Sequence, residues 1–224
     1  MQALELMRTK RLYTHKAVHN APKRFLFIIL LAGARSGPRL KSHLNDYIFI
    51  SHYHDASDGF GNVEDSAQST DEDSDSTSSI IKASYTKKTF LETAPLFSLK
   101  DIESLRNKAQ EAVIAVEIRR YIHSVIVFLR MHRAVDDGVS AQATLHFDLL
   151  VKCLAPLHSL SFVTPSLVAL AVKKIYPHRI NVTTPEKERS MQYGSEIGLV
   201  ASYLEGITPE MIIEDVLSMV EAPL

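Results

Sequence analysis

The sequence predicts a small α/β portion at the amino-terminal end, an acidic segment without regular structure, and a mainly helical remainder. Apolar runs of strand length occur before residue 55, an acidic Ser/Thr-rich stretch follows, and apolar residues recur at helical spacing after residue 97. The single cysteine, Cys153, excludes a disulfide framework and a cysteine-rich zinc module. A mean hydropathy of −0.01 excludes a polytopic membrane protein.

The amino-terminal portion contains two apolar runs that we interpret as strands. Residues 1–9 predict a short helix, and residues 11–14 are compatible with a strand. Residues 25–32, FLFIILLA, are too short to span a membrane, which takes about 20 apolar residues. We interpret this run as a strand buried in a parallel sheet. Residues 40–44 predict one or two helical turns, and residues 47–51 predict a second strand.

Charge is strongly segregated along the chain. Residues 1–45 carry nine Lys or Arg and one acid, whereas residues 46–79 carry nine acids and no Lys or Arg. The stretch between Glu64 and Ser79 contains too little apolar surface to offset the entropy of ordering, so we expect it to be disordered. Ser69 and Thr70 each precede an acid by three residues, which makes them candidate phosphorylation sites for an acid-directed kinase.

Helical spacing dominates the second half. Ser98 is expected to cap a helix over residues 99–108. The next helix, over 113–133, has a wide apolar face made by Ile114, Ile118, Tyr121, Ile122, Val125, Ile126 and Leu129. Ser140 is expected to cap a helix that reaches about Leu157. The side chains expected to face the core are Leu145, Leu149, Leu150, Cys153, Leu154 and Leu157.

Two further helices have the same start signal, a Thr at the cap followed by Pro at the first helical position. They begin at Thr164-Pro165 and Thr208-Pro209 and are expected to end near Lys174 and Val220. The helices between residues 97 and 180 therefore predict a four-helix module with its own core.

Common catalytic and metal motifs are missing from the sequence. It contains no GxSxG, HExxH, GxGxxG or GxxxxGK[ST] pattern. His52 and His54 have the spacing of metal ligands on a strand, but Ala56 and Ser57 stand where further ligands would follow. The basic residues of 1–45 leave nucleic-acid binding open as a less favoured alternative to a solvated basic face.

Five segments follow one another in an informative order: VEIRRYI (116–122), LRMHR (129–133), GVSAQA (138–143), FVTPSLV (162–168) and HRI (178–180). This order resembles the helical lid of MoxR-type AAA+ ATPases, relatives of the magnesium-chelatase I subunit. Residues 2–7, 21–28 and 43–49 resemble, in turn, the helix after Walker B, the strand leading to sensor 1 and the segment that follows. A fungal group of telomere-capping proteins within this family has a similar RRYI helix.

The resemblance implies a nucleotide site of which this chain keeps little. The family's phosphate loop and Walker B would precede Met1, and its sensor-2 Arg falls on Gln142, whose neutral amide lacks the charge of a guanidinium. Arg133 and Arg179 are the candidate lid contacts to a nucleotide. We therefore expect no catalytic residue, metal or cofactor for this chain. ATP and Mg²⁺ would concern only a protein that contains the missing half.

The resemblance also assigns domains. It implies a remnant of the AAA+ α/β core over 1–55, an acidic disordered linker over 56–96, a mainly α four-helix lid over 97–182, and a tail with one helix over 183–224. The implied function is a non-catalytic interaction or assembly module. We expect protein partners, including a homo-oligomer or an AAA+-type assembly, and no membrane. The look-alike group implies nuclear or cytoplasmic residence and telomere or genome maintenance.

The main alternative is an enzyme. In that case the chain is a truncated magnesium-chelatase-like ATPase, in which ATP hydrolysis drives remodelling or metal insertion.

Overall fold

The computed structural model describes residues 2–14, 17–22, 25–31, 40–53, 97–191 and 196–223. The chain divides into two compact units, one of residues 1–52 and 103–224 and the other of residues 53–102. The predicted disordered linker over 56–96 lies wholly outside the described residues, and so do Ser69 and Thr70.

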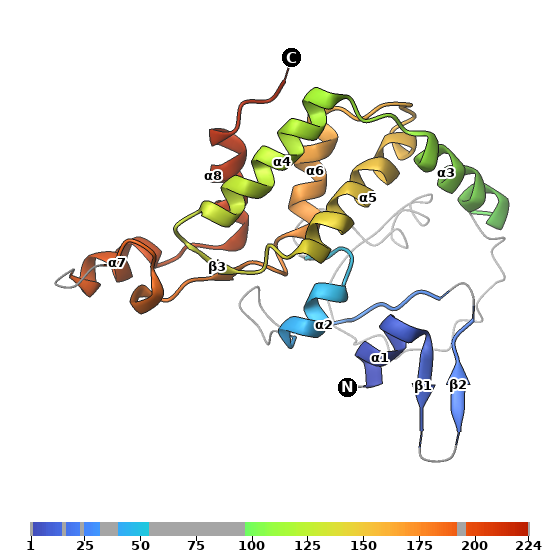
Figure 1. Ribbon diagram of the computed structural model, residues 1–224, viewed down its shortest axis with the longest axis horizontal. Helices are drawn as coiled ribbons and strands as arrows, with labels where there is room; N and C mark the ends of the chain where they lie inside the picture. The colour runs from blue at the N-terminus through green and yellow to red at the C-terminus, as the bar shows by residue number, and fades with distance from the viewer. Residues whose placement is uncertain are drawn as a thin grey trace, which may run out of the picture. The chain divides into compact units, whose positions relative to one another are not determined.

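Four helices of the first unit enclose one apolar core (Figure 1). They are α4 (Val116–Met131), α5 (Ala141–Leu157), α6 (Pro165–Ile175) and α8 (Pro209–Met219). Helix α5 lies along α6, and α8 contacts both α4 and α6. We call these four helices the helical core. They confirm the mainly helical part of the predicted fold.

The apolar face predicted for α4 is buried. Its buried side chains are Ile118, Tyr121, Ile122, Val125, Ile126 and Leu129. Ile114, just before the helix, packs against the same core from a partly buried position. The face was predictable because large apolar side chains recur every three or four positions along it.

The face predicted for α5 was right at Leu150, which is buried, and at Leu154, which packs against the core, but wrong at three other leucines. Its buried residues are Ala143, Phe147, Leu150, Val151 and Ala155, whereas Leu145, Leu149 and Leu157 are exposed. The buried face of α5 carries small residues and so does that of α6, where Ala171 is completely buried. Small side chains let two helix backbones approach closely, and that contact decides which face turns inward.

The fourth helix of the core differs from the prediction. Helix α3 (Leu99–Glu111) buries only Ala109, and its Leu99 and Ile102 are exposed. Helix α8, which the prediction assigned to the tail, buries Ile212, Ile213 and Val216 in the core. The region 183–224 also contains a second helix, α7 (Ile197–Leu204), after the short 3-10 helix η2 (Pro185–Lys187). The prediction of a tail with one helix is therefore corrected.

The helix starts follow their sequence signals. Ser140 accepts a hydrogen bond from the Ala143 backbone N–H at 3.0 Å, and Thr208 caps α8 through the Met211 N–H. At α3, Ser98 Oγ accepts from the Asp101 N–H, while Ser98 donates through both its N–H and its hydroxyl to the Asp101 carboxylate. These hydrogen bonds lower the pKa of Asp101.

A short antiparallel sheet joins the ends of the helical core. Strand β3 (Val135–Asp137) follows α4 and pairs with β4 (Asn181–Val182), which follows α6. Gly138, directly after β3, has φ +117°, and a Cβ there would lie 2.0 Å from the Arg179 carbonyl oxygen. Only glycine fits this position, because the two backbones touch and the conformation is left-handed.

The amino-terminal region contains helices and a hairpin. Helix α1 (Gln2–Thr9) and strand β1 (Arg11–Tyr13) occur where the sequence predicts them, and β1 pairs with β2 (Val18–Asn20). Helix α2 (Ser42–Tyr47) starts two residues later than predicted and includes the start of the expected strand at 47–51. That strand is wrong: residues 48–51 are irregular, and the Ser51 N–H donates to the Lys174 carbonyl.

The predicted buried strand at 25–32 is also wrong for its described residues. Residues 25–31 form no strand, and Leu26, Ile28 and Leu30 are 80%, 70% and 90% exposed. A continuous apolar run becomes a buried strand only when strands pair with it on its edges and other elements cover its faces. Among the described residues nothing pairs with 25–31. Residues 25–31 therefore do not form the parallel-sheet strand that the sequence predicts.

A membrane-spanning helix is not found in the described parts of the chain, since none of the helices there is long and apolar enough to cross a bilayer.

The exposed apolar run at residues 25–31 predicts self-association. Replacing Leu26, Ile28 and Leu30 together with Ser should weaken it without lowering the free energy of unfolding, because exposed apolar patches promote association and add little to the core. Sedimentation velocity over a concentration series measures the first effect, and denaturant unfolding measures the second. Leu129→Ser, at a completely buried position, is the control that must lose stability. A triple variant that unfolds as readily as this control would show that the run is buried in solution.

Candidate functional site

A buried polar cluster lies where α2, the start of α5 and the turn after α6 meet. Its centre is Arg179, whose side chain is only 1% exposed. The sequence places Arg179 between the end of α6 and β4, and the close approach of Gly138 fixes its backbone. A buried guanidinium is costly unless its charge and its N–H groups are satisfied, so its partners define the site.

Arg179 donates to groups from two distant parts of the chain. Its Nη1 donates to Asp46 Oδ1 at 3.2 Å, and its Nη2 donates to the Ile48 carbonyl at 2.6 Å and to His146 Nδ1 at 2.7 Å. The same Asp46 oxygen accepts a hydrogen bond from the Ser140 hydroxyl. The ion pair and these hydrogen bonds together hold residues 46–48 against α5 and the turn after α6.

His146 extends the cluster to Gln142. Arg179 has only donors, so Nδ1 of His146 accepts and the ring proton resides on Nε2. The Gln142 amide lies 2.8 Å from Nε2. Its oxygen accepts this proton when it faces the ring, an orientation that is open because the oxygen and nitrogen ends of an amide are alike in shape. Burial, and then the Arg179 charge, lower the pKa of His146, which keeps the ring neutral.

His178 connects the other side of the cluster to residues 45–51 through hydrogen bonds. Its Nδ1 lies 2.9 Å from Ser51 Oγ, its Nε2 lies 3.2 Å from the Ile48 carbonyl, and its backbone carbonyl accepts from the Asn45 amide. Burial is the main cause that lowers the pKa of His178 to about 4, and the neighbouring Arg179 charge adds to it. His178 is therefore neutral near pH 7.

Arg133, the third candidate lid residue, lies elsewhere. Its Nε donates to Glu188 Oε1 at 3.0 Å, its Nη2 donates to Ser190 Oγ at 3.1 Å, and the guanidinium lies 4.6 Å from the centre of the Tyr203 ring. The Glu188 carboxylate is completely buried, and hydrogen bonds from Ser190 and Arg133 lower its pKa. Arg133 thus joins the end of α4 to α7 and the segment before it.

The structure brings together two of the three candidate nucleotide residues, Gln142 and Arg179, through His146. Sequence reasoning missed Asp46, Ser140 and His146 as members of the cluster. Asp46 and Ser140 stood within the segments matched to the family, yet nothing in the sequence shows that residues 94 positions apart share a hydrogen bond. His146 lies one helical turn after Gln142, a spacing that places both on one face of α5.

Of the two histidines considered as metal ligands, the structure describes only His52. His52 Nδ1 lies 3.2 Å from Lys174 Nζ, and His54 lies outside the described residues. No group of three His, Cys, Asp or Glu side chains suited to a metal occurs among the residues that the structure describes. Cys153 is half-buried, and burial raises the pKa of its thiol, as expected for an unreactive core cysteine.

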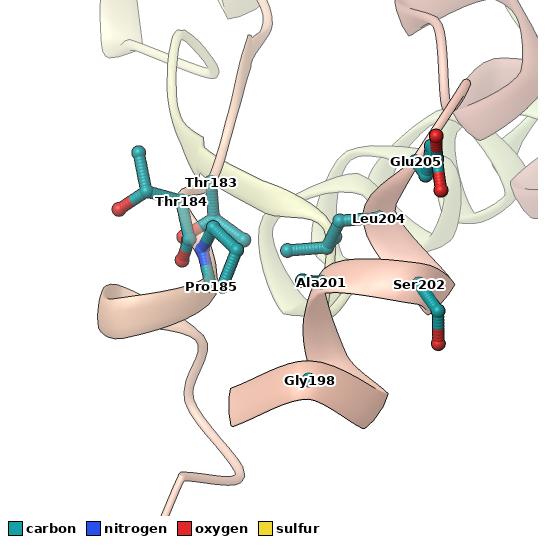
Figure 2. Close-up of a pocket in the computed structure, with 8 residues that line it drawn as sticks. All are labelled: Thr183, Thr184, Pro185, Gly198, Ala201, Ser202, Leu204 and Glu205. Carbon is teal, nitrogen blue, oxygen red and sulfur yellow. The ribbon is translucent and has the colours of Figure 1, made fainter. Parts of the chain in front are cut away.

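A hollow of about 550 Å³ lies between residues 183–185 and α7 (Figure 2). Gly198 and Ala201 leave room on the helix side, and Leu204 points toward the opposite segment, whereas the Ser202 hydroxyl points away from it. Its lining residues bring no acid–base pair or nucleophile together. The buried cluster around Arg179 is therefore the better candidate site.

A solved structure shows the class of fold. The chain matches the crystal structure of a protein described as a "putative ATPase" from Cytophaga hutchinsonii with a TM-score of 0.65 and 16% sequence identity. The match covers 99% of this chain and 61% of the other chain. At this identity the likeness shows a shared fold and nothing of the activity. No family model matches the chain.

Sequence relatives indicate a narrower group than the shared fold does. The chain is 30% identical over 116 residues to "maintenance of telomere capping protein 2" of Lachancea thermotolerans and 36% identical over 88 residues to that of Kluyveromyces lactis. These matches cover 50% and 37% of this chain and 41% and 32% of the two relatives. The protein of the same name from Vanderwaltozyma polyspora is 30% identical, over 49% of this chain and 34% of its own length.

The chain is therefore a distant homologue of the fungal maintenance of telomere capping protein 2, which confirms the resemblance seen in the sequence. Each match spans less than half the length of these relatives.

The Arg179 ion pair should contribute strongly to stability. We expect Arg179→Met to lower the free energy of unfolding by about 3 kcal/mol, because it leaves Asp46 and the Ile48 carbonyl without their buried donor. Lys173→Met is the matched control: it breaks a pair with Glu214 in which both side chains are at least half exposed, so it should cost less than about 1 kcal/mol. Chemical denaturation measures both, and equal losses would show that the cluster is not buried in solution.

The buried histidines should make stability depend on pH. The folded-state pKa of His178 lies below its ordinary value of 6.5, so the unfolded chain binds more protons. Its contribution is complete above pH 6.5 and is lost as pH falls toward about 4, by up to about 3 kcal/mol. Denaturant unfolding between these pH values measures the slope. His178→Gln should flatten the slope, and an unchanged slope would exclude His178 as its source.

Proposed function

We propose that this chain acts as a non-catalytic AAA+-type helical module that binds protein partners and supports assembly. The observation that carries the proposal is that Arg179 forms an ion pair within the chain itself. Its guanidinium is buried and paired with Asp46, so it does not offer its charge to a phosphate. The homologues' printed name supports a role in telomere maintenance, and a nuclear or cytoplasmic location would accord with it.

The position that resembles sensor 2 supports the same proposal. Phosphoryl transfer depends on positioned positive charge around the phosphates, and the neutral amide of Gln142 supplies none. That amide is engaged with His146 on the same helix. Arg133 is likewise committed to a buried carboxylate, that of Glu188. All three candidate nucleotide contacts thus have structural partners.

Exposed apolar side chains support the interaction part of the proposal. Leu145, Leu149 and Leu157 lie on α5 and are 64%, 52% and 61% exposed. Apolar surface concentrated on one element commonly marks a protein interface, because burying it on association is favourable. A second copy of the chain and an unrelated protein are both consistent with such a surface.

The alternative, ATP hydrolysis by a longer protein that includes this chain, is supported by the shared fold with the ATPase-like structure, of which this chain covers 61%. In that case the phosphate-binding groups come from residues outside this sequence. Mapping the 5′ end of the transcript tests this alternative, since it requires an upstream in-frame GxxxxGK[ST] motif.

Nucleotide titration tests the proposal for this chain directly. We expect no binding of a fluorescent ATP analogue with Mg²⁺ at up to about 1 mM nucleotide, because the lid cations are internally paired. Circular dichroism of the same sample is the control that the chain is folded. Saturable binding in the micromolar range, or hydrolysis above the buffer rate, would overturn the proposal.

A further inference from the structure

The amino-terminal hairpin presents its side chains to solvent. Strands β1 and β2 lie side by side after α1 (Figure 1). Every residue of the two strands except Leu12 is exposed, and the side chains of both strands are absent from the apolar core. The hairpin therefore adds little to the burial of apolar surface, and its side chains are available to a ligand.

One face of the hairpin combines a cation, an aromatic ring and an amide. Alternate residues of a strand share a face, and so do residues that lie opposite each other across a ribbon. Arg11 and Tyr13 therefore share a face with their partners Asn20 and Val18. Tyr13 is 46% exposed. Proteins use these groups to contact the phosphates, base faces and base edges of nucleic acids.

Three cations occur together where α1 ends and β1 begins. Arg8, Lys10 and Arg11 fall within four consecutive residues, and all three are exposed. Among the residues that the structure describes, no carboxylate forms an ion pair with any of them. Arg133 and Arg179, in contrast, pair with acidic groups of the chain. The hairpin cations are therefore able to offer their charge to phosphates.

Local hydrogen bonds hold the backbone of the hairpin. The Thr9 hydroxyl oxygen accepts from the Arg11 N–H at 3.3 Å, across Lys10, whose φ of 56° is left-handed. At the other end of β1, the N–H and the hydroxyl of Thr14 both donate to the Ala17 carbonyl. A surface that is ordered before binding loses less conformational entropy when a ligand binds.

We propose that the β1–β2 hairpin binds single-stranded nucleic acid, with Tyr13 stacked on an unpaired base and Arg8, Lys10 and Arg11 in contact with phosphates. The exposed ring favours a single strand, because the base faces of a duplex are already stacked on one another. DNA and RNA share this chemistry of bases and phosphates. The site is separate from the cluster around Arg179 and does not depend on the proposed non-catalytic function.

Fluorescence anisotropy of the full chain with labelled DNA and RNA single strands of about 20 nucleotides tests the proposal, at about 50 mM salt. Replacing Arg8, Lys10 and Arg11 together with Gln should weaken binding more than about tenfold. It should also lower the slope of log affinity against log salt by about 2, because three phosphate contacts are lost. Arg119→Gln is the matched control, since it removes an exposed cation of α4 and should leave affinity unchanged.

Tyr13 separates stacking from simple charge attraction. Tyr13→Ala should weaken single-strand binding about tenfold with the salt slope unchanged, because base stacking is lost and phosphate contacts remain. Tyr13→Phe keeps an aromatic ring and should bind as the wild type does. Polyglutamate, which has charge without bases, should bind equally to the wild type and to Tyr13→Ala.

Three results would overturn the proposal. They are no wild-type binding below about 100 µM at this salt, equal affinity of the triple variant and Arg119→Gln, and equal affinity of Tyr13→Ala and Tyr13→Phe. Tighter binding to a duplex than to a single strand would also exclude it. Circular dichroism checks that each variant is folded, and Arg11→Gln alone replaces the triple variant in the same comparison if that variant fails to fold. Nucleotide titration of the wild type, described above, tests the non-catalytic function independently.

Discussion

The buried guanidinium of Arg179 is the constraint on which the arrangement around the start of α5 depends. A charge with 1% of its side chain exposed must have a counter-charge and hydrogen-bond acceptors close at hand. Asp46, His146 and the Ile48 carbonyl supply them, and two of these, Asp46 and Ile48, come from the end of α2 and the residue after it. The chain therefore cannot place this segment elsewhere without leaving a buried charge unpaired.

The same constraint links fold to function. Arg133 and Arg179 pair with acidic groups of the chain itself, so these cations are not available to a ligand. Gly138 makes this possible, because only a residue without a Cβ lets the loop after β3 touch the backbone of Arg179. Arg133, just after the end of α4, follows the same pattern, since it pairs with the buried carboxylate of Glu188.

Most local structure was predictable from the sequence. Ser98, Ser140 and Thr208 cap the helices that they were expected to cap, and the apolar face of α4 is the buried one. These features depend on neighbours within a few residues. The errors are part of the inward face of α5, the choice of α8 over α3, the strands expected at 25–32 and 47–51, and the unpredicted helix α7. Most of them depend on long-range contacts. The candidate site was half predictable, since Gln142 and Arg179 were named, whereas Asp46, the carboxylate partner of Arg179, was not.

The sequence by itself determined the helices, their caps, the segregation of charge and the resemblance to the telomere-capping group, because each is a property of consecutive residues. Only the tertiary structure decided which apolar faces are buried and that Asp46 neutralises Arg179. The physical reason is that burial and ion pairing depend on which segments meet. The pattern FLFIILL requires a sheet around it to become a strand, and the described residues provide none.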